Sequence, residues 1–133
     1  MFSFFTTNEA NAVLPDVIKK FEFALAKQNE IKKIEKELEM SVSTTNSFEN
    51  FVTLKQTLNS AITKFYESVE ILENTGVVVK SIEQGLLDFP SKRFDEEVWL
   101  CWKHGETEIK FWHEKDSGFM GRKPIEVSDE SLV

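Results

Sequence analysis

Apolar residues recur every three or four positions along the first half of the chain and mostly every second position along the second half. A spacing of three to four places one apolar stripe along a helix, whereas alternation places one apolar face on a strand. The change of period falls near Gly76. The sequence therefore predicts an α+β fold in which helices come first and an antiparallel sheet follows.

The first helix is expected to begin at a capping box and to continue past a proline. Thr6 and Glu9 have the spacing at which each side chain bonds the backbone N–H of the other residue. Pro15 follows within about two turns, where it either kinks the helix or begins it, and we expect the kink. The apolar stripe then continues to Met40.

The second helix is expected to pack against the first as an antiparallel hairpin spanning residues 7–75. A polar segment, residues 41–47, separates the two helices and offers an N-terminal cap at Asn46 or Ser47. Gly76 suits a left-handed C-terminal cap. The second stripe contains four residues spaced seven apart: Phe51, Leu58, Phe65 and Leu72. This spacing is typical of a coiled coil. The hairpin either buries its own stripe or dimerises through it, and both alternatives stay open.

The second half is expected to form an antiparallel sheet with a glycine-rich loop over residues 77–124, followed by a tail, residues 125–133. A short aromatic run, residues 1–6, is expected to add an N-terminal strand. The expected sheet strands are residues 77–79, 86–89, 98–103 and 107–113, and the second ends at Pro90. With 133 residues, the whole chain is expected to form a single domain with its own core.

The register of the last hairpin is predicted from the turn at Gly105 and Glu106, which suit the centre of a two-residue type II′ turn. Trp99 would then face Trp112. One face, expected to pack on the helices, contains Val98, Leu100, Trp102, Ile109, Phe111 and His113. The other contains Trp99, Cys101, Lys103, Glu108, Lys110 and Trp112. An exposed tryptophan pair requires a cover, either more of this protein or a ligand.

The side chains with most chemical potential follow in residues 113–124. His113, Glu114 and Asp116, together with Asp88, supply nitrogen and carboxylate ligands for a divalent metal. Their spacing matches no established metal signature. Neighbouring strand residues also point to opposite faces, so His113 and Glu114 need a bend to hold one ion.

Two other roles for this segment remain open. In the structural role, Asp116 and Ser117 form a turn, Gly118 and Gly121 supply unusual backbone angles, and Arg122 pairs with Asp88, Glu114 or Asp116. In the binding role, the glycine-flanked amides and Arg122 hold a small anion. The chain contains no serine–histidine–aspartate order, phosphate-binding loop or paired cysteine motif.

Composition narrows the function classes. The net charge of −7 argues against nucleic-acid binding, which depends on neutralising phosphates. The single cysteine, Cys101, cannot form an internal disulfide, which suits the cytoplasm. The chain shows neither a secretion signal nor an apolar run near the roughly 20 residues that span a bilayer. Twelve Phe and three Trp suggest that some aromatic rings lie at a subunit interface or in a groove.

Several motifs resemble an uncharacterised family, domain of unknown function 2203. They are Phe5-Thr6 with residues 9–15 (EANAVLP), residues 85–90 (GLLDFP), residues 98–102 (VWLCW), and residues 111–114 (FWHE) with 118–124 (GFMGRKP). The resemblance covers most of the chain in the same order. It implies a small stand-alone prokaryotic protein and carries no established activity.

The leading hypothesis is a non-enzymatic cytoplasmic protein that forms homo-oligomers through its helices or sheet. It would bind a ligand or partner at the sheet end, through Trp99, Cys101, Trp112, His113 and Arg122. The alternative is a small metal-dependent enzyme that uses His113, Glu114, Asp116 and Asp88, with Arg122 holding an anionic substrate. A third hypothesis is a coiled-coil adaptor that binds a partner through its helices.

Overall fold

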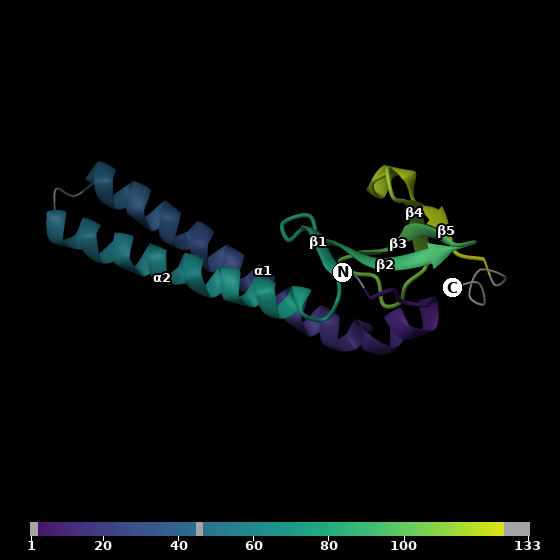
Figure 1. Cartoon of the computed structure of the whole chain (residues 1–133). Coiled ribbons are helices and arrows are strands. Elements are labelled where there is room, and N and C mark those ends of the chain that lie inside the picture. The colour runs from purple at the N-terminus through teal and green to yellow at the C-terminus, as the bar shows by residue number, and fades with distance from the viewer. Residues whose placement is uncertain (1–2, 45–46, 127–133) are drawn as a thin grey trace.

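Two long helices pack together, and the first of them also carries a five-stranded antiparallel sheet (Figure 1). The computed structural model describes residues 3–44 and 47–126, with the side chains of residues 43 and 44 outside the description. Its elements are α1 Thr7–Thr44, α2 Phe48–Glu73, β1 Val78–Ser81, β2 Leu86–Arg93, β3 Glu96–Lys103, β4 Phe111–Glu114, the short 3-10 helix η1 Phe119–Gly121, and β5 Lys123–Pro124. The predicted α+β fold is confirmed.

Both helices begin where capping residues indicate. Thr6 N donates to Glu9 Oε1 at 2.9 Å and Glu9 N donates to Thr6 Oγ1 at 3.0 Å, which is the expected capping box. Pro15 lies inside α1, so the helix does not begin there. Ser47 caps α2 by accepting from Asn50 N at 3.1 Å.

The first helix extends further than the polar segment at residues 41–47 predicted. Ser41 is buried and still helical, and its hydroxyl accepts a 2.6 Å hydrogen bond from Asn50 Nδ2 of α2. This contact between the helices satisfies a polar side chain that the sequence alone suggested was in a loop.

The strands follow one another in the sheet in the order β1-β2-β3-β4-β5, every pair antiparallel. One sheet face packs on the N-terminal half of α1, while the far ends of α1 and α2 extend away from the sheet (Figure 1). Phe21 of α1 meets Trp102 of β3 edge to face, with ring centres 5.2 Å apart. The core between helix and sheet contains Leu14, Val17, Phe21, Leu87, Phe89, Leu100 and Trp102.

The prediction that Pro90 ends the second strand is wrong, because β2 continues to Arg93. Pro90 O accepts from Phe5 N at 2.8 Å. The N and O atoms of a strand residue point to the same side, so the missing N–H of Pro90 faces Phe5 and not β3. A two-residue turn, Phe94 and Asp95, then connects β2 to β3, with φ of 52° and 67°.

The short N-terminal strand is not confirmed. Residues 1 and 2 lie outside the described residues, and residues 3–6 are not in a strand. Phe5 is nevertheless joined to β2, because its carbonyl also accepts from Ser91 Oγ at 2.6 Å. In the expected C-terminal tail, residues 127–133 lie outside the described residues.

The predicted register between β3 and β4 is wrong by one residue. Trp99 pairs with His113 and Leu100 pairs with Trp112. The turn has His104 and Gly105 at its centre, because Glu106 N donates to Lys103 O at 3.0 Å. Residues 106–110 then form an irregular connection before β4 begins. A shift of one residue exchanges the two faces of a strand, so His113 and Trp112 lie on the opposite sides from those expected.

Candidate functional site

The sheet face turned away from α1 carries a buried group of three reactive side chains. Asp88 of β2 pairs directly with Cys101 of β3, and His113 of β4 lies beside them on the same face. All three side chains are buried. Because successive strand residues alternate between faces, only the observed register brings His113 and Cys101 together.

The closest contact in this group joins His113 to Asp88. The Nε2 atom of His113 lies 3.0 Å from Oδ2 and 3.1 Å from Oδ1 of Asp88, and each side chain is 3% exposed. The other ring nitrogen, Nδ1, lies 2.9 Å from the carbonyl oxygen of Glu114. A carbonyl only accepts, so Nδ1 carries a hydrogen and donates it.

One further proton therefore lies between Nε2 and Asp88. It belongs either to a neutral carboxylic acid that donates to a neutral imidazole, or to an imidazolium that donates to a carboxylate. Burial raises the pKa of Asp88 above its ordinary value of 3.8, against the opposing effects of His113 and Lys80, which favours the neutral form. The pair has no net charge in either form.

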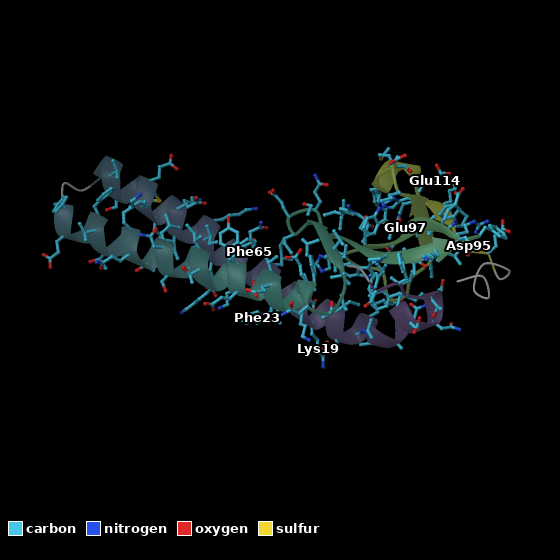
Figure 2. All side chains as sticks on the ribbon, viewed as in Figure 1. Lys19, Phe23, Phe65, Asp95, Glu97 and Glu114 are labelled. Carbon is cyan, nitrogen blue, oxygen red and sulfur yellow. The ribbon has the colours of Figure 1, made fainter. Side chains whose placement is uncertain are left out.

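A turn after β4 fixes the imidazole. The carbonyl of Glu114 accepts from Ser117 N at 3.1 Å as well as from His113 Nδ1. The side chain of Glu114 points elsewhere and is paired with Lys123 Nζ at 2.7 Å in solvent. Glu114 thus orients the His113 ring through its backbone carbonyl. Figure 2 labels Glu114 at the sheet end of the molecule.

The Cys101 thiol is held in its protonated form. Burial, and secondly the neighbouring Asp88, raise its pKa to about 12, although Arg122 acts in the opposite direction. The thiol is therefore a poor nucleophile by itself. A bound cation would reverse this, because a coordinating thiol loses its proton outright.

Arg122 supports the group from one side. Its guanidinium carbon lies 4.0 Å from the ring centre of Phe111 and 4.2 Å from that of Phe119. Its Nη1 donates to Glu106 Oε2 at 2.9 Å, in an ion pair whose side chains are 16% and 21% exposed. The expected pairing of Arg122 with Asp88, Glu114 or Asp116 is therefore replaced by Glu106.

A cavity of about 170 Å³ opens directly onto the three side chains. Its lining includes Asp88, Cys101 and His113, together with Lys80, Leu86, Ser117, Gly118 and Phe119. Lys80 Nζ lies 4.0 Å from Asp88 Oδ2 and 4.5 Å from the ring centre of Trp99. The buried group is thus reachable from solvent, with one cation at the rim.

The three side chains have the composition of a transition-metal site. One ligand atom from each of Asp88, Cys101 and His113 can be chosen so that all lie within 4.8 Å of one another. Thiolate, imidazole and carboxylate are the three ligand types that Zn²⁺ takes, and a site with three protein ligands keeps one position for water or substrate. The hydrogen bond from His113 Nδ1 to a carbonyl is the kind that usually orients a metal-bound histidine.

The structure separates the residues that the sequence grouped. Asp88 and His113 lie together, whereas the Glu114 side chain and Asp116 are exposed and lie outside the three-residue cluster. Trp99 and Trp112 do not stack, since Trp112 lies on the helix side with Arg93 4.5 Å above its ring. Gly118 has a φ of −106°, so the unusual backbone angle expected there is absent.

Two residues that line the cavity, Cys101 and Lys80, are absent from the metal ligands that the sequence predicts. The sequence presents Cys101 as a candidate for ligand binding only, and it gives Lys80 no role. A two-residue turn at Phe94 and Asp95 is the feature that pairs Asp88 with Cys101. The sequence does not reveal this turn, because neither position is the glycine or asparagine that usually marks one.

A comparison with protein-family models matches residues 3–125 to "Uncharacterized conserved protein (DUF2203)". The chain belongs to this family. The DUF2203 match contains all three clustered residues and Arg122, and the family description names no activity. Neither the curated proteins nor the solved structures gave a significant match. Among the described residues, each helix of this DUF2203 protein lacks a continuous apolar stretch long enough to cross a membrane.

Proposed function

We propose that the protein binds one divalent transition-metal ion, best matched by Zn²⁺, through Asp88, Cys101 and His113. The observation that carries the proposal is the buried convergence of three different ligand types at the base of a cavity. Asp88 and His113 are paired with each other without metal, and a bound ion would replace that contact with ligand bonds to all three side chains.

Charge balance supports the proposal. Without metal, the Asp88–His113 pair is neutral overall and the Cys101 thiol is protonated. A divalent ion held by a carboxylate, a thiolate and a neutral imidazole is also formally neutral. Exchange of two protons for one M²⁺ therefore leaves no uncompensated charge in a buried site.

The decisive experiment is titration of chelator-treated protein with Co²⁺ and Zn²⁺, together with elemental analysis. We expect one ion per chain, and a thiolate-to-cobalt charge-transfer band that disappears in Cys101→Ala. His113→Asn and Asp88→Asn should weaken metal binding by more than the roughly 10- to 100-fold typical of changes to groups that only orient a ligand. Glu114→Gln and Asp116→Asn are matched controls, because both exposed side chains lie outside the cluster.

The wild-type spectrum decides the question even if a variant fails to fold. A cobalt complex without the thiolate band, or no stoichiometric uptake of either metal, would refute the proposal. Unchanged affinity in all three ligand variants would also refute it.

A metal-dependent enzyme is the second candidate. The cavity beside the three ligands supports it, because an open metal position is what distinguishes catalytic from structural zinc sites. Comparing hydrolysis of an activated ester by the zinc-loaded and chelator-treated protein tests this candidate. Equal rates for the two forms would leave a binding role alone.

Self-association is a separate part of the proposal. Among the described residues, six large apolar side chains on the helical pair are at least half exposed: Phe23, Met40, Val42, Phe48, Tyr66 and Ile71. Figure 2 labels Phe23 on this part of the molecule. Such residues favour an interface with a second copy. Light scattering that shows a monomer at all concentrations would contradict self-association. A coiled-coil adaptor would then have to bind a different protein through these helices.

A cytoplasmic location and the absence of nucleic-acid binding are also proposed. The free, buried Cys101 supports the first and the net charge of −7 supports the second.

A further inference from the structure

We infer that the metal-loaded centre binds a small carboxylate with a short apolar tail, whose headgroup reaches both the metal and Lys80. This inference rests on the proposed metal site. It adds the chemical class of the ligand that would take the remaining metal position.

The position of the cavity supports this ligand class. Asp88, Cys101 and His113 all line the same cavity, so an ion held among them faces it. The cavity volume of about 170 Å³ is close to the ~150 Å³ that admits a benzene-sized molecule. A carboxylate with a few carbon atoms fits this space, whereas a nucleotide or peptide does not.

The charges favour an anion of charge −1. The ion with its three ligands is formally neutral, so Lys80 at the rim leaves the cavity with a positive charge. The charge of Arg122 is already balanced by its ion pair with Glu106. Lys103 is a further cation on the same side of the sheet, with its Nζ 5.3 Å from the ring centre of Phe119. The cationic groups around the cavity thus exceed the anionic ones, which attracts an anionic ligand.

The walls distinguish a carboxylate from an inorganic oxyanion. Leu86 and Phe119 present apolar surface to the cavity. A carboxylate can direct both oxygens to the metal and Lys80 and leave its tail against these residues. A tetrahedral phosphate would place further charged oxygens against them without hydrogen bonds, which is costly.

The test uses full-length protein loaded with Co²⁺, whose visible spectrum reports ligands at the open position. Acetate and propionate are titrated separately, with inorganic phosphate as the comparison. We expect saturable spectral changes with both carboxylates. Propionate should bind about fourfold more tightly, the effect of one additional buried CH₂ group.

Because Lys80 is partly exposed and screened, Lys80→Gln should weaken acetate binding by about fivefold, while the cobalt affinity stays within about threefold. Lys92→Gln is the matched control. Lys92 extends from β2 on the same sheet face, but its Nζ lies over Phe4, 4.6 Å from the ring centre, outside the cavity lining. It should leave acetate binding unchanged.

The outcomes separate the two proposals. Failure to bind cobalt refutes the metal site itself. Cobalt binding with no response to either carboxylate overturns only the ligand inference, as does phosphate binding more tightly than propionate. Equal loss of acetate affinity in Lys80→Gln and Lys92→Gln also overturns it, because the effect would then be one of overall charge.

Discussion

His113 of β4 reaches across β3 to Asp88 of β2, with Nε2 3.0 Å from Oδ2 and 3.1 Å from Oδ1. This contact connects two strands that are not neighbours in the sheet, and it passes directly beside Cys101. It therefore holds the three reactive side chains together on the sheet face that carries the cavity.

The free energy of unfolding should depend on the protonation of Asp88. Its pKa is raised in the folded protein, so its stabilising contribution is complete below the ordinary value of 3.8 and is lost as the pH rises through the raised value. The stability of metal-free wild type relative to Asp88→Asn should therefore decrease from about pH 4 upward, by about 1.4 kcal/mol for each pH unit that separates the raised pKa from the ordinary one. Urea unfolding at a series of pH values measures this. A relative stability that increases with pH would indicate an ionised Asp88 paired with a charged His113.

Cys101 should react slowly with alkylating reagents in the folded, metal-free protein. A thiol with a pKa of about 12 has very little thiolate at pH 8. We expect labelling about a thousandfold slower than in denaturant, where the pKa returns to an ordinary value. Arg122→Ala should slow it further, because Arg122 lowers the pKa. Rapid stoichiometric labelling of the native protein would disprove the protonated, buried state.

Metal binding should release protons. The metal-free site holds one proton between Asp88 and His113 and one on Cys101, and the metal displaces both. Calorimetric titration with Zn²⁺ near neutral pH, in buffers of different ionisation enthalpy, should give about two protons per ion. Cys101→Ala should reduce this number by one. A value near zero would mean that the ion binds elsewhere.

Two glycines in the turns that follow β1 and β3 should differ in their tolerance of alanine. Gly105 has a φ of 105° with open space around it, so Gly105→Ala should cost only backbone strain, about 1–2 kcal/mol. Gly85 also has a positive φ, but an added Cβ would overlap the side chain of His104. Gly85→Ala should therefore be the more destabilising, as measured by thermal unfolding. Equal losses would mean that His104 moves freely out of the way.

Asn11 should stabilise the connection between β3 and β4. Its Oδ1 accepts from the N–H of buried Ile109 at 2.7 Å. Asn11→Ala leaves that N–H unpaired and should cost about 1–3 kcal/mol, with faster hydrogen exchange at Ile109. Asn8→Ala, at an exposed position of α1, is the control and should change neither. Unchanged exchange at Ile109 in Asn11→Ala would show that solvent replaces the bond.

Much of the helical half could be predicted from the sequence because its determinants are local. The Thr6–Glu9 capping box, the Ser47 cap and the end of α2 before Gly76 depend on residues within a few positions of one another. The stripe with Leu58 and Leu72 repeats with the period of the helix, and both side chains are buried. Pattern alone was therefore sufficient to determine the order of helices and sheet.

The candidate site depended on contacts that are remote in sequence. Asn11 holds Ile109, while Glu106 accepts from Lys103 N at 2.7 Å and pairs with Arg122. These bonds accompany a connection longer than the predicted two-residue turn. The resulting shift of one residue in register places His113 on the face of Cys101 and Asp88.

The sequence by itself thus determined the α+β order, the start of each helix, the end of the second helix and the residue types available for chemistry. The tertiary structure decided which of these residues meet. Side chains alternate between the two faces of a strand, so a shift of one residue in the register moves every side chain of β4 to the opposite face. The continuation of β2 through Pro90 was likewise decided by a contact with backbone distant in sequence, since Pro90 O accepts from Phe5 N.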